Sequence, residues 1–237
     1  MRRLLTISAV ALILGFAVAQ TAAAQQTVSV YLGGFLPQGL DSRGSDDVLF
    51  QNNAFLTTLN RQRGIDMNEF NGFTFGGEYL IGFGNNLEAG LGIGFYQKTA
   101  PVVYTDSVNA NGQEIFQDLK LRVIPFNATV RFLPLGHRSA VQPYIGAGVG
   151  VFSWRYSETG EFIDSRNNIF VDNFVGSGAV AGPVILGGVR FPMGPFAAGG
   201  EVRWQDAKAD LPNDEGFAGP KINLGGFNYL FTMNFRF

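Results

Sequence analysis

The chain has 237 residues, with 17 basic and 19 acidic side chains, 32 glycines, 23 phenylalanines and no cysteine. The slightly acidic charge balance argues against nucleic acid as a partner, and the lack of cysteine excludes disulfide cross-links. The many aromatic residues exclude an intrinsically disordered chain.

Residues 1–24 have the layout of a secretory signal peptide. Two arginines precede an apolar run that is too short for a transmembrane anchor, and small residues follow it up to Ala24. We expect cleavage after Ala24 or, alternatively, after Ala19. Residues 25–237 would then form one exported domain.

Eight strand-like segments follow, recognised by side chains that alternate with a period of two. The alternation is clearest in residues 73–83 and 87–98, where one face is mainly apolar and the other carries glycine, polar and charged residues. The predicted strands are 27–37, 72–83, 87–104, 117–133, 141–156, 175–191, 196–208 and 221–237.

The connections between these segments alternate in length, and the long ones are 38–71, 105–116, 157–174 and 209–220. Short turns at one end and long loops at the other are typical of outer-membrane barrels. The sequence therefore predicts an all-β fold, an eight-stranded antiparallel up-and-down transmembrane β-barrel whose short turns face the periplasm. The apolar face of each strand should meet lipid.

One predicted strand, 117–133, changes phase in the middle. Lys120 and Arg122 share one parity, whereas the polar residues after Pro125, including Arg131, share the other. Because proline cannot donate to the strand ladder, we expect a β-bulge near Pro125, with both sets of polar residues facing the interior.

The predicted interior face carries both signs of charge. Because unpaired ions in a confined lumen are costly, these residues should form ion pairs, in particular Glu88 with Arg131 and Glu201 with Arg203. An eight-stranded barrel is just wide enough for side chains to fill it, so we expect a plug, with a gated path for small solutes as the alternative. The predicted lumen charge network consists of Glu78, Glu88, Arg131, Arg190, Glu201, Arg203 and Arg236.

The strands that return to the periplasmic side end on phenylalanine. In three of them the phenylalanine follows an arginine, as in Phe235-Arg236-Phe237 at the end of the chain. An outward phenylalanine at this level would join the aromatic girdle at the membrane interface. The predicted girdle residues are Phe83, Phe132 and Phe191.

The signal peptide, the eight strands and the terminal Phe237 together resemble the small outer-membrane β-barrels of the OmpA/OmpX type. The segment 143–151 (PYIGAGVGV) is also similar to the glycine-alternating strands of the outer membrane protein beta-barrel group. The resemblance implies a place in the bacterial outer membrane, among its lipid and lipopolysaccharide. It also implies that Phe235 and Phe237 are the signal read by the barrel assembly machinery. It implies little about function, because fold does not fix function.

The chain offers no catalytic constellation. Its one histidine, His137, lies in the predicted periplasmic turn 134–140, whereas lipid A-modifying enzymes with this type of barrel place theirs near the outer leaflet. We expect His137 to be an exposed turn residue, and we expect no catalytic residue, cofactor or metal. The alternating glycines Gly90, Gly92 and Gly94 give room in a narrow barrel and do not form a nucleotide loop.

The long loops should engage any specific ligand, whose nature the sequence does not give. Residues 46–60 of the first loop could form a short helix on the barrel rim. Asp41, Asp46 and Asp47 could hold a divalent cation, although solvated acids are the simpler expectation.

The function predicted from these features is non-enzymatic, with a structural or surface-interaction role and a plugged lumen. The alternative is passage of small apolar molecules, as in barrels that resemble the OmpW type. Phe152, Trp154 and Tyr156 would line an apolar upper chamber in that case, or form an outer aromatic belt if the phase differs.

Overall fold

The structure is a computed structural model that describes residues 25–59, 61 and 63–237, so the predicted signal peptide lies outside the described residues. Most of the described chain is strand. No helix among these residues is long and apolar enough to cross a membrane. The elements in chain order are β1 (Gln26–Pro37), η2 (Leu40–Ser42), α2 (Val48–Asn52), β2 (Leu56–Thr58), η3 (Met67–Phe70), β3 (Gly72–Phe83), β4 (Leu87–Val108), β5 (Glu114–Phe132), β6 (Gln142–Ile163), β7 (Ile169–Met193), β8 (Phe196–Gln205), β9 (Lys208–Asp210), β10 (Lys221–Asn223) and β11 (Gly226–Arg236).

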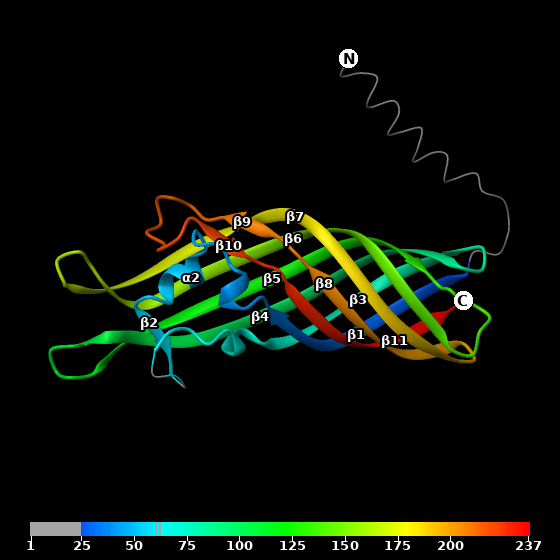
Figure 1. The fold of residues 1–237 in the computed structure, drawn as a ribbon, viewed down its shortest axis with the longest axis horizontal. Coiled ribbons are helices and arrows are strands. Elements are labelled where there is room, and N and C mark those ends of the chain that lie inside the picture. Colours follow the sequence, from blue (N-terminus) through cyan, green and yellow to red (C-terminus); the bar gives the residue numbers. More distant parts are fainter. Residues whose placement is uncertain (1–24, 60, 62) are drawn as a thin grey trace, which may run out of the picture.

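Eight strands close into a ring, which confirms the predicted fold class. The antiparallel order is β4-β3-β1-β11-β8-β7-β6-β5, and the pairing of β4 with β5 completes the circle. The last strand, β11, pairs with β1, with Met233 opposite Val30. Full closure leaves no long unpaired edge among these strands. Figure 1 shows them winding around one long axis.

The barrel has two unlike ends. At the turn end, short connections such as 84–86 join neighbouring strands. At the loop end, the first loop (residues 38–71) and the tips of the β4–β5 and β6–β7 hairpins lie together (Figure 1). The β8–β11 connection, with β9 and β10, also lies at the loop end. The C-terminus lies toward the turn end.

A band of exposed apolar side chains surrounds the half of the barrel next to the turn end. Leu91 and Ile145 are each 67% exposed although both are aliphatic. Apolar exposure on all sides of a closed barrel requires lipid around it. The predicted lipid-facing parity of β3 and β4 is therefore confirmed. The band includes Val30, Leu32, Phe73, Phe75, Leu91, Ile93, Val130, Phe132, Ile145, Val149, Ile185, Val202, Phe231 and Met233.

Toward the loop end, the two faces exchange their polarity. In β5, Leu119 and Leu121 point inward and are buried, whereas Lys120 and Arg122 point outward. The pairing of β5 with β6 runs without a register shift through Pro125. The predicted bulge and the inward direction of Lys120 and Arg122 are thus wrong. The strand keeps its phase, and its surroundings change from lipid to water.

Two segments predicted as loops are largely strand, because the strands extend beyond the apolar band into water. Residues 105–116 and 157–174 continue the hairpins beyond the apolar band, so that the actual turns are only 109–113 and 164–168. Many of their exposed side chains are polar, such as Asp106, Thr159 and Asp172, and this polarity makes the sequence look like loop.

An apolar core fills the barrel at the loop end. Phe152, Trp154 and Tyr156 of β6 all point inward and are buried, which decides between the two directions considered from the sequence. The first loop folds over them and contributes its own buried apolar side chains, including Leu49 and Phe70. β2, also part of this loop, pairs with β4 beyond the point where β3 begins. The three aromatic residues are therefore packed in an apolar core that the upper strands and the first loop form together.

A buried ion pair stabilises the first loop and connects it to β10. Asp47 caps α2 by accepting hydrogen bonds from Leu49 N and Phe50 N, and its carboxylate also lies 3.0 Å from Arg43 Nη1. The backbone of Asn223 in β10 donates to the same carboxylate, at 2.7 Å. The helix predicted within 46–60 is present as α2. Asp47 is committed to these protein donors and is not free to bind a cation.

Candidate functional site in the barrel lumen

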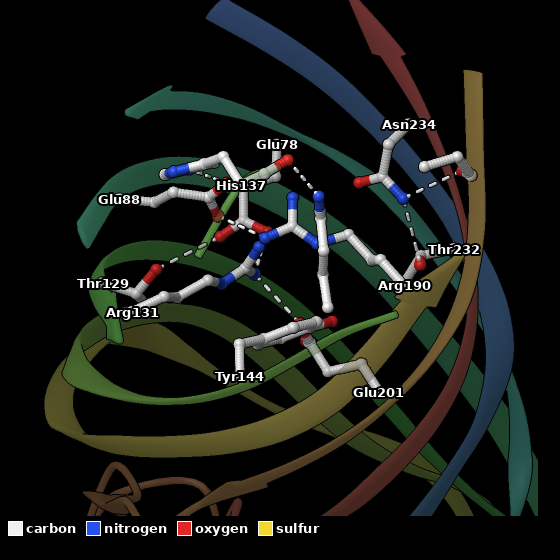
Figure 2. A network of polar contacts seen from close by, with 12 residues as sticks. Glu78, Glu88, Thr129, Arg131, His137, Tyr144, Arg190, Glu201, Thr232 and Asn234 are labelled. Atoms are coloured by element: carbon white, nitrogen blue, oxygen red, sulfur yellow. Dashed lines mark hydrogen bonds and ion pairs between the residues drawn. The ribbon is translucent and has the colours of Figure 1, made fainter. Parts of the chain in front are cut away.

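The lumen beside the apolar band is lined by polar side chains from neighbouring strands. The sequence sets this pattern, because every second residue of each strand must point inward. β3 supplies Glu78, β4 supplies Glu88, β5 supplies Arg131 and β7 supplies Arg190. Each of these side chains is at most 5% exposed. Figure 2 shows them converging on the barrel axis with Tyr144 and Glu201.

A central cluster joins two carboxylates to two guanidinium groups. Arg131 forms ion pairs with Glu78 and with Glu201, the second at 3.0 Å. Arg203 reaches the same two carboxylates, at 2.6 Å for Glu201 Oε1 and 3.5 Å for Glu78 Oε2. Each charge thus faces opposite charges, which offsets the cost of removing these ions from water. Thr129 adds a hydrogen bond to Glu78 Oε1 at 3.2 Å.

Two tyrosines complete the cluster. Tyr144 donates a hydrogen bond to Glu201 Oε2 at 3.0 Å, and its ring lies 5.1 Å from Arg131 Cζ and 4.8 Å from Arg190 Cζ. Tyr31 lies under Arg203, at 5.2 Å. These ring faces stabilise the cations through cation–π attraction. Sequence reasoning missed both tyrosines, although Tyr144 shares the inward parity of the glycines that follow it in β6.

A second cluster lies nearer the turn end. Glu88 pairs with Arg190 at 2.5 Å, and its Oε1 lies within hydrogen-bond distance of His137 Nε2, at 3.0 Å. Gln142 donates to the backbone carbonyl of His137, and its own Oε1 accepts a hydrogen bond from Arg236 at 2.6 Å. These contacts connect the turn 134–140 to the side chains inside the barrel.

The predicted partners within the lumen need correction. Glu88 and Arg131 are opposite each other on adjacent strands, but their side chains do not pair with each other. The long Arg131 side chain extends across the lumen to Glu78 and Glu201, and Glu88 is instead compensated by Arg190. Glu201 and Arg203 do pair, as expected from their shared face.

Two further residues differ from the sequence-based expectation. The side chain of His137 is only 7% exposed, because the ring turns back into the lumen toward Glu88, so the prediction of an exposed turn residue is wrong. Arg236 is only half-buried and forms no ion pair among the described residues, so it lies at the margin of the predicted network.

Glycines on the inward face provide the space that the large charged side chains occupy. A Cβ atom added at Gly90 would lie 2.8 Å from Glu78 Oε1. At Gly148 it would lie 2.0 Å from the backbone oxygen of Ala128. Gly90 therefore leaves room for the Glu78 side chain, and Gly148 allows the backbone of the adjacent strand to approach closely.

The chemistry of this site is structural charge compensation. Among the described residues, no group of three histidine, cysteine or acidic side chains could hold a metal ion. The three carboxylates of the two clusters are each engaged by arginine. The predicted girdle residues Phe83, Phe132 and Phe191 lie outside the same region and are exposed. Most of the ion pairs in the two clusters join strands that are not adjacent in the ring.

A closed ring of antiparallel strands, an apolar outer band and a polar interior define an outer-membrane β-barrel, and the protein is a small barrel of this class, located in the outer membrane.

Among solved structures, the chain is similar to a major outer membrane protein from Thermus thermophilus, with 13% identity over 91% of this chain and 100% of that chain, and a TM-score of 0.49. Neisserial surface protein A has 12% identity over 90% of this chain and 97% of its own, with a TM-score of 0.47. The N-terminal β-barrel domain of Pseudomonas aeruginosa OprF has 12% identity over 90% of this chain and 99% of its own, with a TM-score of 0.39.

No family model matches the sequence, and no curated protein matches it either.

Proposed function

We propose that the protein is a closed, non-enzymatic barrel that strengthens the outer membrane and presents a surface for interaction beyond it. The observation that carries this proposal is the buried charge network. Its arginines and carboxylates extend across the lumen from several strands, so the axis is occupied by paired side chains (Figure 2). A continuous water path would have to break these pairs, which is costly in a confined interior.

The apolar core at the loop end supports the same proposal as a second seal. Phe152, Trp154 and Tyr156 pack against the first loop and are buried. Ions crossing the barrel would have to displace this core after passing the charged clusters. Two unlike seals in series favour a closed barrel over a gated path.

Conductance in a planar lipid bilayer tests the proposal directly. Purified protein, shown by its gel mobility to be folded, should give no discrete conductance steps, whereas a porin added to the same bilayer should give them. Sustained steps from the folded protein alone would contradict the closed barrel.

The inward aromatic residues of β6 favour one alternative, the OmpW-like passage of small apolar molecules. Against it, the apolar side chains are packed and the charged clusters lie below them. Liposomes that contain the protein should therefore take up naphthalene no faster than empty liposomes. Faster uptake would favour the alternative.

The outer face beyond the apolar band supports an interaction with lipopolysaccharide as the neighbouring partner. Arg122 and Arg155 lie directly opposite each other on β5 and β6, with Lys120 close by. None of the three forms an ion pair among the described residues. Opposed like charges destabilise a strand pair unless an anion lies between them. Replacing all three residues by glutamine should weaken the binding of lipopolysaccharide phosphate groups. Equal binding by the variant and the unmodified protein would contradict an interaction with lipopolysaccharide at this surface.

A further inference from the structure

A separate cavity of about 400 Å³ lies at the loop end, between the first loop and the upper parts of β4 to β7. Its volume is in the range of small-molecule sites. It lies outside the charge network, because all of its lining residues belong to the long hairpins, the first loop or the β8–β11 connection. Its aromatic lining consists of Phe55, Tyr104, Phe162, Phe170 and Phe174.

These aromatic rings are organised in contact with one another. Phe162 lies 4.5 Å from Phe174 and 5.7 Å from Phe170, measured between ring centroids. Phe55 of the first loop stacks on Tyr104 of β4 at 6.2 Å. Rings from several elements therefore give the cavity preformed walls whose faces carry partial negative charge.

Two polar residues in this wall, Glu158 and Gln117, each have an acceptor oxygen without a hydrogen-bond partner among the described residues. Glu158 is 3% exposed, and both of its hydrogen bonds, from Asn52 and Tyr156, go to Oε1. No hydrogen bond reaches its Oε2, and no basic side chain pairs with it, in the part of the chain that the structure describes. A buried carboxylate without a cation is costly, and burial raises the pKa of Glu158 for this reason. A positively charged partner beside Oε2 would offset this cost and stabilise the ionised form.

Gln117 gives a second, independent indication. Its Nε2 donates to Tyr104 and to the backbone carbonyl of Glu161, which fixes the orientation of the amide. Its Oε1 is buried and has no hydrogen-bond partner among the described residues. Buried polar atoms are nearly always paired, so an unpaired acceptor in the wall of a cavity points to a ligand that donates.

The charge of the cavity excludes an anionic occupant. Among the described residues that line it, none is lysine, arginine or histidine. Asp164 at the tip of the β6–β7 hairpin adds a further negative charge, since hydrogen bonds from Asn168 hold its pKa below the usual value. Cation–π attraction and charge-assisted hydrogen bonds act in the same direction here.

From these observations we infer that the cavity binds a small organic cation, a protonated amine on an apolar or aromatic body. The ammonium group donates to the Glu158 carboxylate, and the body contacts the aromatic rings. A small shift of the Gln117 side chain brings its buried Oε1 to the same ammonium group. The proposed ligand class is distinct from the structural role of the lumen and does not depend on whether the barrel is closed.

Calorimetric titration of the whole protein in zwitterionic nanodiscs tests this site, with empty nanodiscs subtracted. The probes are 2-phenylethylammonium, the neutral 2-phenylethanol and the anionic 3-phenylpropionate. Only the ammonium should show saturable binding. All three probes carry a phenylalkyl group, so a difference in binding reports on the charge of the head group. Equal binding of all three probes, or no saturable binding of the ammonium, would overturn the proposal.

Two matched variants locate the binding. Glu158→Gln removes the charge but keeps the size of the side chain, and it should weaken ammonium binding about tenfold or more. Glu114→Gln makes the same change at an exposed position outside the cavity and should leave binding unchanged. Unchanged affinity in Glu158→Gln, with normal folded gel mobility, would also overturn the proposal.

Discussion

Arg131 illustrates how a single residue acts in this lumen. It is 2% exposed and contacts two carboxylates from β3 and β8, so its guanidinium joins strands that are not neighbours in the ring. Its removal would leave Glu78 and Glu201 buried with less compensation for their charges. The penalty therefore comes mainly from the charges left behind.

Replacing Arg131 by methionine should lower the free energy of unfolding by about 3–5 kcal/mol, the range for breaking a buried ion pair. The measurement is reversible unfolding in lipid vesicles, followed by gel mobility. Lys120→Met on the same strand is the matched control, and it should change stability by less than about 0.5 kcal/mol because Lys120 is exposed. Adding Glu78→Gln to Arg131→Met should restore part of the loss. Similar stability of the two single variants would show that the network contributes little.

Leu91 tests the lipid-facing parity. It is 67% exposed within the apolar band, so Leu91→Arg should destabilise the barrel by about 2–4 kcal/mol if the residue lies near the membrane midplane. Leu91→Met is the control and should be nearly neutral. The measurement is the same unfolding assay in vesicles. An unchanged free energy of unfolding in Leu91→Arg would mean that this face does not meet lipid.

The adjacent position shows a constraint that parity alone does not reveal. A Cβ atom at Gly92 would lie 3.2 Å from Glu78 Cγ and 3.2 Å from the Gly77 oxygen. Gly92→Ser therefore requires small shifts of the Glu78 side chain or of the neighbouring strand. The substitution should destabilise the barrel, although the inward parity of Gly92 alone would predict a small effect.

At the scale of elements, the first loop behaves as a folded lid on the apolar core rather than as a free loop. Its side chains belong to the core, and Asp47 joins α2, Arg43 and β10 through one carboxylate. The neighbouring Asp46 makes a different kind of contact, an exposed ion pair with Lys221 at 2.9 Å. The hydrogen bond from Lys221 holds the pKa of Asp46 below its usual value, but exposed pairs of this kind contribute little stability.

Asp47→Ala should release the first loop while the barrel remains folded, because it removes the helix cap and leaves Arg43 buried without its partner. We expect protease cleavage within residues 38–71 to become much faster in vesicle-inserted protein, with heat-modifiable gel mobility retained. Asp46→Ala serves as the adjacent control and should keep the resistance of the unmodified protein. Equal protease resistance of the two variants would contradict the anchoring role of Asp47.

At the scale of the whole molecule, closure of the barrel depends on β11, which pairs with both β1 and β8. Its outward side chains are aromatic or apolar up to the C-terminal Phe237, whereas Thr232 points inward. We propose that this terminal strand is what the barrel assembly machinery engages. A change at its end should therefore act on assembly more than on the stability of the finished barrel.

Deleting Phe237 should reduce the amount of folded protein in the outer membrane far more than Thr232→Ala does. The measurement is membrane fractionation followed by gel mobility with and without heating. Equal yields of folded protein from the two variants would contradict the proposed role of Phe237 in assembly.

The sequence by itself determined the eight strands, the closed barrel and the lipid-facing parity of β3 and β4. These follow from a period of two, which is a local property of the chain, and a strand shifted by one residue would expose its polar face to lipid. The sequence also identified the residues that carry charge into the lumen, since inward direction follows from the same parity.

Only the tertiary structure decided which charges pair and which solvent each strand meets. Arg131 passes over the opposite Glu88 because carboxylates from other strands lie within reach across the lumen, and His137 turns inward because the 134–140 turn folds over Glu88. Alternation in β5 likewise shows that its two faces differ, but it does not show where along the strand the outer solvent changes from lipid to water. Lys120 and Arg122 therefore look like lumen residues until the end of the apolar band is known. Beyond the band, water replaces lipid outside and an apolar core replaces the charges inside.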